Sequence, residues 1–181
     1  MSINILGISG SLRADSHNTA ALRAAQSLAP AGVTVQIADI SGVPLYQEEV
    51  YQAGFPAAVE TLREQIRAAD ALLIATPEYN YSFSGVLKNA IDWVSRPPSH
   101  PFDGKPVGII GASAGRLGTA RAQYHLRQVF VFLNSQVLNK PEVMIGGANN
   151  AFADGKLTDE FASKSISDML TALAAAVEKN R

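Results

Sequence analysis

Residues 7–19, with the sequence GISGSLRADSHNT, combine glycine, hydroxyl and arginine groups directly behind a short apolar run. Glycine permits backbone angles that orient successive N–H groups toward one point, and Gly7 and Gly10 supply it here. An alanine-rich helical pattern follows, and the positive end of that helix is expected to point at the same place. These backbone N–H donors are suited to bind a phosphate group. Further donors are available on the side chains of Ser9, Ser11, Arg13, Ser16 and Thr19.

The spacing of this motif argues against two common phosphate sites. The motif lacks the Gly-Lys-Ser/Thr sequence of a P-loop, which disfavours a nucleoside triphosphate with magnesium. Gly7 and Gly10 do not form G-x-G-x-x-G, so a dinucleotide fingerprint is unsupported. A hydroxyl-rich loop favours a terminal monophosphate held by many hydrogen bonds. The alternative is an ordinary strand-to-helix turn, capped by Ser16 or Asn18, that binds no ligand.

A second candidate segment, residues 76–81 (TPEYNY), follows another apolar run. Pro77 fixes its own backbone angle, Asn80 offers an amide donor and acceptor, and Tyr79 offers a flat apolar face. This combination suits a planar heterocycle with polar edges. The alternative is a proline-led turn whose tyrosines pack on a neighbouring helix. A third turn, residues 112–118, is also rich in small residues and leads into a helical pattern.

Strand and helix patterns alternate along the chain, which predicts an α/β fold with a parallel sheet. The expected strands are residues 3–6, 33–37, 71–75 and 107–111, with 136–138 and 142–145, separated by Pro141, as candidates for the last strand. The expected helices are residues 22–29, 56–69, 87–94, 118–133 and 166–177, and residues 38–55 are expected to form a long surface connection. The three candidate turns follow the first, third and fourth strands. Because ligands bind beyond the carboxyl ends of such strands, the turns line one crevice if those strands are neighbours.

The composition restricts the class of protein. A chain of 181 residues is expected to form one domain, residues 1–181, with a full hydrophobic core. The net charge of −1 argues against nucleic-acid binding, and the lack of cysteine excludes disulfides, thiol nucleophiles and thiolate metal sites. His17, His100 and His125 lack the spacing of metal ligands, so no metal site is expected. No apolar run approaches the ~20 residues of a membrane helix, and no signal-peptide pattern is found, so we expect a cytoplasmic protein without membrane contact.

Three segments, GSLRADSHN (10–18), PEYNYSFSGVLKNAIDWVSRP (77–97) and SAGRLGTARAQYHLRQ (113–128), resemble the NAD(P)H-dependent FMN reductase family. The resemblance extends from residue 5 to about residue 142 and is strongest to the bacterial quinone and chromate reductase branch. It implies a flavodoxin-like three-layer sandwich with a five-stranded parallel sheet, and noncovalently bound FMN.

The resemblance also implies which residues contact FMN. The phosphate is expected at Ser11, Leu12, Arg13, Ser16, Asn18 and Thr19. The isoalloxazine ring is expected to border Pro77, Glu78, Tyr79 and Asn80, and to touch Ser113, Ala114 and Gly115 on another side. No side chain is expected to act as a catalytic acid or base, and the Glu78 carboxylate is expected to turn toward a helix terminus or a neighbouring group. Phe83-Ser84 departs from the family pattern, which leaves the substrate preference open.

By the same resemblance, the protein is expected to be an enzyme. FMN would accept a hydride from NADPH or NADH and then pass two electrons to a quinone in a ping-pong cycle, with chromate, azo compounds and nitro compounds as further small-molecule acceptors. A homodimer or homotetramer is implied, with Arg121, Tyr124 and Glu142 as candidates for contacts between subunits. Two alternatives stay open: a flavodoxin-type one-electron carrier, which the balanced charge and the PEYN segment disfavour, and a phosphate-ligand sensor without turnover.

Overall fold

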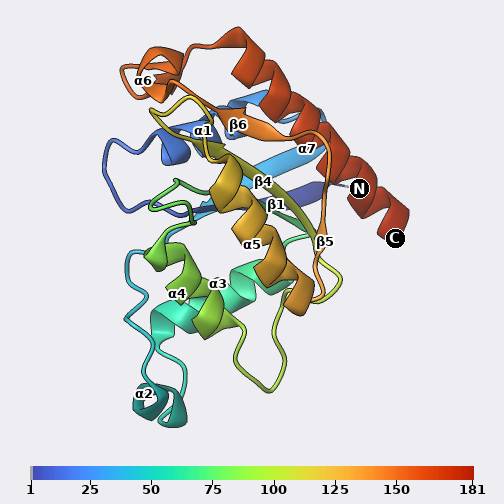
Figure 1. Ribbon diagram of the computed structural model, residues 1–181. Helices are drawn as coiled ribbons and strands as arrows, with labels where there is room; N and C mark the ends of the chain where they lie inside the picture. Colours follow the sequence, from blue (N-terminus) through green and yellow to red (C-terminus); the bar gives the residue numbers. More distant parts are fainter. Residues whose placement is uncertain (1) are drawn as a thin grey trace.

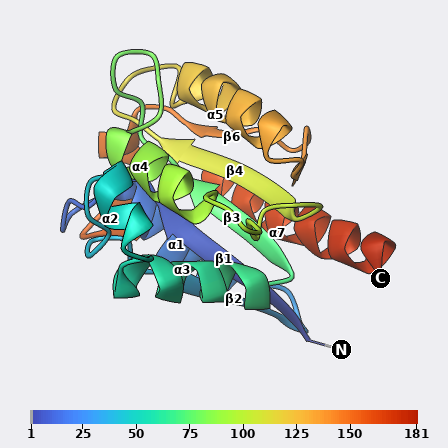
Figure 2. The same cartoon turned by 90° about the horizontal axis from the view of Figure 1, so that it is seen from below.

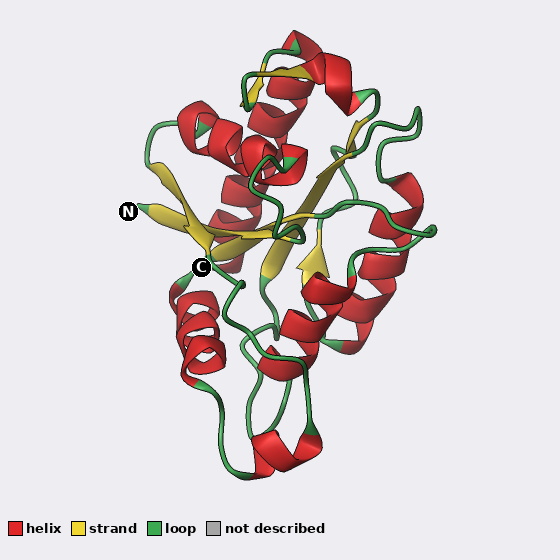
Figure 3. Ribbon diagram, turned by 90° about the vertical axis from the view of Figure 1, so that its left-hand side faces the viewer, coloured by secondary structure: helices red, strands yellow, loops and turns green. Residues whose placement is uncertain are grey.

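A parallel sheet lies between two layers of helices in the computed structural model, which describes residues 2–181 (Figures 1 and 3). In chain order the elements are β1 (Ile3–Ser9), α1 (His17–Leu28), β2 (Val33–Ala38), α2 (Glu48–Gln52), α3 (Ala57–Ala68), β3 (Ala71–Ala75), α4 (Gly85–Val94), β4 (Pro106–Ala112), α5 (Ala120–Phe132), β5 (Gln136–Val137), β6 (Val143–Ile145), α6 (Ala148–Ala151), β7 (Phe152–Ala153), β8 (Lys156–Leu157) and α7 (Glu160–Asn180). The strand order is β2-β1-β3-β4-β5, and β6 also pairs with β4. This order is the flavodoxin-like arrangement that the family resemblance implied.

The sheet is buried on both faces because helices cover each of them (Figure 2). Every residue of β3 and β4 is buried, as expected for parallel strands between two helical layers. One core contains Leu22 and Ala25 of α1 with Ile166, Leu170 and Leu173 of α7. The other contains Leu62 and Ile66 of α3, Leu87 and Ile91 of α4, and Leu126 and Phe130 of α5. Burying each such aliphatic side chain contributes about 1.5–3 kcal/mol, so both layers hold the strand ends firmly in register.

Two glycines of β4 let neighbouring elements approach the strand closely. A Cβ added at Gly108 would lie 2.8 Å from the Met169 sulfur of α7. A Cβ added at Gly111 would overlap the Thr119 hydroxyl and lie 2.5 Å from the Thr76 carbonyl oxygen. The end of β3 and the residue before α5 therefore pack directly on the backbone of β4.

The sequence predicted most elements, with a few differences. The predicted interruption of the last strand is confirmed, because β5 and β6 both pair with β4 and Pro141 lies between them. A connection was predicted at residues 38–55. It begins at residue 39, because Ala38 still belongs to β2, and it contains the short helix α2. The β7–β8 hairpin was not predicted. Its signal was Asp154-Gly155, whose φ angles of 49° and 72° are typical of a two-residue hairpin turn. Along residues 2–181, no helix is both long and apolar enough to cross a membrane.

Candidate active site

Three loops at the carboxyl ends of β1, β3 and β4 meet around one cavity of about 180 Å³. The strand ends are level, because Ser9 pairs with Ala75 and the Thr76 N–H donates to the Ile110 carbonyl at 3.0 Å. The expected convergence of the three turns is thus confirmed. The cavity is lined by Ser11, Arg13, Ser16, His17, Asn18, Pro77, Glu78, Tyr79, Ala112, Ser113, Ala114 and Asn149.

The first of these loops, residues 10–16, leads into the N-terminus of α1, and we call it the phosphate loop. Ser16 is buried and is the N-cap of α1, where its Oγ accepts a hydrogen bond from the Thr19 N–H at 3.3 Å. The N–H groups of His17 and Asn18 lie in the first turn, where a helix supplies no acceptor of its own. The positive end of α1 therefore borders the cavity, as an anion site requires.

Other side chains of the phosphate loop are more accessible. Leu12 is 51% exposed, and the Ser11 hydroxyl accepts a hydrogen bond from the Arg13 N–H at 3.4 Å. Arg13 is exposed, and its guanidinium makes only a weak hydrogen bond to the Asp15 carbonyl at 3.4 Å. In the described part of the chain it has no carboxylate partner. One cation and one hydroxyl are therefore available beside the helix N-terminus.

Two residues expected at the phosphate have side chains that are engaged within the protein. The Asn18 carboxamide donates to the Ala112 carbonyl at 3.0 Å and accepts from the Ala112 N–H at 2.9 Å. The Thr19 hydroxyl lies 2.8 Å from the Ser9 hydroxyl. These pairs fix α1 against the ends of β4 and β1, so the side chains of Asn18 and Thr19 position the helix N-terminus at the cavity.

In the second loop, which follows β3, the Glu78 carboxylate turns toward the start of α5, as expected. The Glu78 side chain is only 6% exposed and accepts hydrogen bonds from the N–H groups of Arg121 and Ala122, at 3.1 and 3.2 Å. It also forms an ion pair with the Arg121 guanidinium. Glu78 therefore caps α5 and neutralises its N-terminus. Because Glu78 is the only acidic residue in the cavity lining, the cavity retains a positive character.

The second loop continues into a tight turn, residues 79–82, which we call the tyrosine turn. Tyr79 and Ser82 exchange N–H···O=C hydrogen bonds, both at 2.9 Å. Between them, Asn80 and Tyr81 have left-handed φ angles of 51° and 66°. The rings of Tyr79 and Tyr81 are 51% and 63% exposed, so neither is packed away as a core residue. The turn thus presents aromatic surface beside the cavity.

The third loop leads from β4 to α5 and is hydrogen-bonded to β6, the strand beside β4. The Ser113 N–H donates to the Ile145 carbonyl at 3.0 Å, and the Gly115 N–H donates to the Ser113 hydroxyl at 3.2 Å. Ser113 and Ala114 line the cavity, whereas Gly115 is not among its lining residues. This loop therefore supplies part of the cavity wall.

Three lining residues, His17, Ala112 and Asn149, were not among the contact residues predicted from the sequence. Asn149 lies in α6, directly behind β6, so a fourth strand end reaches the cavity. The signal was the polar pair Asn149-Asn150, which follows Gly146-Gly147-Ala148 just after that strand. His17 belongs to no metal-binding group, because within residues 2–181 no three His, Cys, Asp or Glu side chains are placed to hold an ion.

Phe83-Ser84, the pair that departs from the family pattern, has a structural role. The Ser84 hydroxyl donates to the Gly10 carbonyl at 2.5 Å, and Ser84 is also the N-cap of α4. Phe83 is partly buried against the core on that side of the sheet. The pair therefore fixes the second loop to the phosphate loop.

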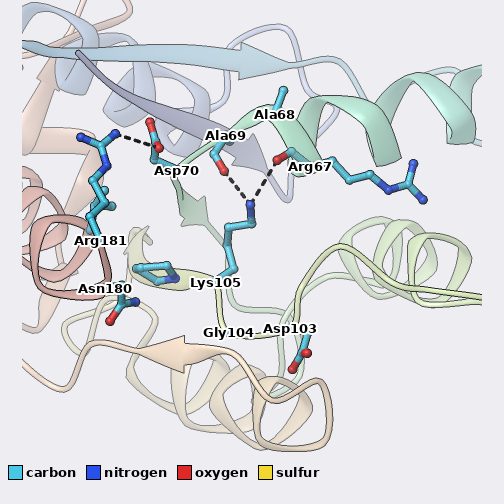
Figure 4. A pocket seen from close by; sticks show the side chains of 11 residues that line it. Arg67, Ala68, Ala69, Asp70, Asp103, Gly104, Lys105, Asn180 and Arg181 are labelled. Atoms are coloured by element: carbon cyan, nitrogen blue, oxygen red, sulfur yellow. Dashed lines mark hydrogen bonds and ion pairs between the residues drawn. The ribbon is translucent and has the colours of Figure 1, made fainter. Parts of the chain in front are cut away.

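A second cavity, of about 380 Å³, lies at the opposite end of the strands, beside the residues that precede β3 and β4 (Figure 4). Its polar groups pair with one another: the Lys105 ammonium donates to the Ala69 carbonyl at 2.6 Å, and Arg181 donates to Asp70 at 3.0 Å. Burial lowers the pKa of Lys105, and the nearby Asp70 carboxylate opposes that shift. Because Lys105 satisfies carbonyl groups at the end of α3, we interpret this cavity as structural.

Lys105→Met is expected to lower the free energy of unfolding by about 1–2 kcal/mol, because it removes a charged donor from the Ala69 and Arg67 carbonyls. Lys88→Met is the matched control. It removes an exposed ion pair with Asp92, worth less than about 0.5 kcal/mol. Urea unfolding measures both variants, and equal losses would contradict the role given to Lys105.

Comparison with known proteins adds independent findings. The family model described as NADPH-dependent FMN reductase matches residues 3–150. The chain is 64% identical over 180 residues to an NAD(P)H-dependent FMN reductase of Pseudomonas aeruginosa, covering 99% of this chain and 97% of the relative. It is 45% identical over 181 residues to a quinone reductase of Escherichia coli, covering 98% and 96%. Among solved structures, a flavoenzyme NAD(P)H:(acceptor) oxidoreductase from Paracoccus denitrificans matches with a TM-score of 0.88 and 34% identity, covering 98% of each chain.

Proposed function

Because the chain belongs to the NADPH-dependent FMN reductase family, we propose that it is an FMN-dependent NAD(P)H oxidoreductase that reduces quinones by two electrons. NADPH or NADH is the hydride donor, and chromate, azo compounds and nitro compounds are further acceptors. The observation that supports this function best is the meeting of a hydroxyl-rich, positively charged loop with an aromatic turn around one cavity. FMN has both a phosphate monoester and a planar ring, so it matches both the positively charged loop and the aromatic turn.

The donor set of the phosphate loop fits the phosphate of FMN. An available guanidinium, a hydroxyl and the N-terminus of α1 border the cavity, and the one carboxylate in its lining is paired with α5. A dianionic group gains charge-assisted hydrogen bonds there and meets no unpaired negative charge in the cavity lining. We propose that the phosphate is held by Ser11, Leu12, Arg13, Ser16, Asn18 and Thr19, with Asn18 and Thr19 acting through the helix N-terminus that their side chains fix.

The second and third loops fit the flavin ring. We propose that the ring is bordered by Pro77, Glu78, Tyr79 and Asn80 and by Ser113, Ala114 and Gly115. When bound, FMN supplies the redox chemistry, accepting a hydride from the nicotinamide and passing two electrons to the acceptor. The protein's residues bind and orient the ring, and the exposed tyrosine turn leaves one side open for a planar substrate. A quinone also takes up two protons, one from the donated hydride and one from solvent, so no side chain has to supply them.

Initial-rate kinetics test this function. We expect parallel double-reciprocal plots when NADPH is varied at several fixed quinone concentrations, because both substrates use the same cavity in turn. Intersecting lines would contradict a shared site. Absence of NADPH oxidation by the FMN-saturated protein would favour the one-electron carrier instead.

We further infer that one flavin-binding domain, residues 1–181, assembles into a homodimer or homotetramer through α5. Tyr124, Val131 and Phe132 of this helix are 54%, 78% and 86% exposed, an apolar group typical of an interaction surface. The Tyr124 hydroxyl donates to Glu142 at 3.1 Å, and this hydrogen bond raises the pKa of Tyr124. A cytoplasmic location is proposed because the hydride donors are cytoplasmic metabolites.

Tyr124→Ala is expected to weaken subunit association by about tenfold, because it removes an aromatic anchor from the α5 surface. FMN affinity is expected to stay within about twofold, since Tyr124 does not line the cavity. Light scattering over a dilution series measures the mass, and Tyr124→Phe is the control that keeps the ring. An unaltered mass profile for Tyr124→Ala would exclude this surface as the interface.

A further inference from the structure

We propose that the hydride donor places its adenosine end in a separate cavity beyond β2, where Arg23 binds the 2′-phosphate that distinguishes NADPH from NADH. The inference rests on the proposed function, because it gives a site to the part of the nicotinamide cofactor that does not react. NADPH is then the preferred donor.

The cavity beyond β2, which we call the β2 cavity, has a volume of about 340 Å³ and lies between the phosphate loop, α1 and residues 37–41. β2 is the edge strand beside β1, and its last residue, Ala38, pairs with Ile8 of β1. The cavity therefore lies beyond the carboxyl ends of two level strands, where parallel α/β sheets bind nucleotides. It shares Ser11 and Arg13 with the cavity of the candidate active site, so the two cavities adjoin at the phosphate loop.

Arg23 supplies a free guanidinium to the β2 cavity. It is exposed and lies one helical turn after Thr19, on the same face of α1. Within residues 2–181, the guanidinium has neither a carboxylate partner nor a hydrogen-bond acceptor. A guanidinium in this state can bind a phosphate through two parallel hydrogen bonds. Arg13 borders the same cavity, but the phosphate of FMN is proposed to engage it, which leaves Arg23 for a second phosphate.

The other walls of the β2 cavity suit a ribose and an adenine ring. Leu12 is 51% exposed and, with Ile37, gives the cavity an apolar side on which a base can pack. Asp39 follows β2, and its Oδ1 accepts a hydrogen bond from the Ser41 N–H at 2.8 Å. This hydrogen bond lowers the pKa of Asp39, so the carboxylate stays ionised and can accept a hydrogen bond from a ribose hydroxyl.

The balance of these groups favours a phosphate over a free hydroxyl at the 2′ position. Among the described residues that line the β2 cavity, Asp39 is the only acidic one, and it already accepts from Ser41, whereas the N–H donors of Arg23 are all available. A carboxylate accepts one hydrogen bond from a single hydroxyl. A guanidinium forms two with a phosphate and neutralises part of its charge, so the 2′-phosphate gains more at Arg23 than a hydroxyl gains at Asp39.

The two cavities lie side by side, as the two halves of one dinucleotide require. The nicotinamide stacks on the flavin in the active-site cavity, and a flexible pyrophosphate joins it to the adenosine. This pyrophosphate would cross the outer side of the phosphate loop, where Leu12, Arg13 and Ala14 are exposed. No glycine-rich pyrophosphate motif is needed on this path, in agreement with the lack of G-x-G-x-x-G in the phosphate loop.

Anaerobic stopped-flow reduction of the bound FMN by NADPH and by NADH tests the inference. The wild-type protein should react faster with NADPH at limiting donor concentration. Arg23→Gln is expected to lower the ratio of the two second-order rate constants, NADPH to NADH, about tenfold, the factor for one charge-assisted hydrogen bond. Arg23→Lys keeps the charge without the planar fork and should retain part of the preference.

Two further variants show whether the effect belongs to the β2 cavity. Asp39→Asn keeps an acceptor for the Ser41 N–H and removes a negative charge, so it should raise the ratio about threefold. Lys156→Gln is the control with the same loss of charge as Arg23→Gln. Lys156 lines a neighbouring groove with Arg23 but does not line the β2 cavity, so the ratio for this variant should stay within about twofold of wild type.

Binding of adenosine 2′,5′-bisphosphate, measured by calorimetry, tests the site without redox chemistry. Arg23→Gln should weaken its binding to the FMN-loaded protein about tenfold, because the variant loses the contact with the 2′-phosphate. Adenosine 5′-monophosphate lacks that phosphate and should bind wild type and Arg23→Gln within about twofold of each other.

Three kinetic results would overturn the inference: a wild-type preference for NADH, an unchanged ratio in Arg23→Gln, or an equal fall in Lys156→Gln, which would assign the effect to overall charge. Loss of bisphosphate binding in Arg13→Ala but not in Arg23→Gln would place the probe in the phosphate loop and would also overturn it. If neither donor reduces the flavin, the proposed function fails instead, and the bisphosphate titration still decides whether Arg23 binds a phosphate.

Discussion

Gly111→Ala is expected to lower the free energy of unfolding by about 3 kcal/mol, at the upper end of the range for overpacked cores. The new methyl group would overlap the Thr119 hydroxyl and lie 2.5 Å from the Thr76 carbonyl oxygen. Neither neighbour can move freely, because Thr119 is the N-cap residue of α5 and Thr76 directly follows β3. For a chain of this size the loss corresponds to a fall in Tm of about 6–12 °C.

The same substitution is expected to weaken FMN binding. Thr76 leads into Pro77, and Thr119 leads into the helix turn that Glu78 caps, so displacement of either moves the second loop. Gly85→Ala is the matched control, because a Cβ at Gly85 would meet no atom within 4 Å. Differential scanning calorimetry and a flavin titration measure both variants. A Tm for Gly111→Ala equal to that of Gly85→Ala would show that β4 tolerates a side chain there.

Arg13→Ala is expected to raise the Kd of FMN by about 10–100-fold, because a hydrogen bond to a charged partner is worth about 1.5–3 kcal/mol. Arg13 is exposed and makes only a weak hydrogen bond to the Asp15 carbonyl, so its removal should leave the fold intact. Quenching of flavin fluorescence on titration gives the Kd, and the unfolding midpoint shows whether the fold is retained.

Arg67→Ala is the control for Arg13→Ala. Arg67 lies in the last turn of α3 and lines the second cavity, at the opposite end of the strands, so the variant loses the same charge without losing the proposed contact. Its Kd for FMN is expected to stay within about threefold, the effect of one screened charge at longer range. Equal weakening by both variants would mean that only overall charge matters, and unchanged affinity in Arg13→Ala would refute its phosphate role.

The arrangement of the site could be predicted because it depends on local signals that repeat along the chain. Buried apolar runs that end in small or polar turns placed three loops at strand ends, and the parallel topology brought them together. The orientation of Glu78 toward the start of α5 was also predictable, because a carboxylate beside a helix start is stabilised by the helix N-terminus. These features are predictable because the interactions that cause them are encoded by residues close together in the sequence.

Other features depend on partners that are remote in the sequence. Asn18 pairs with the backbone of Ala112, 94 residues away, so its side chain is used for packing α1 rather than directly for a ligand. Arg63 is 1% exposed because it donates to the carbonyl groups of Val94 and Ser99, which an isolated helix pattern does not reveal. The contact of Arg121 with Tyr81 likewise joins two segments whose closeness only the fold creates.

The most direct test of the central claim is the visible spectrum of the FMN-reconstituted protein under anaerobic conditions, first with NADPH and then with a quinone. The bound flavin is expected to bleach fully with NADPH, and its colour is expected to return fully with the quinone. A bound flavin that does not bleach with NADPH would contradict the proposed oxidoreductase and favour an electron carrier. A protein that binds no FMN would contradict the assignment of the phosphate loop itself.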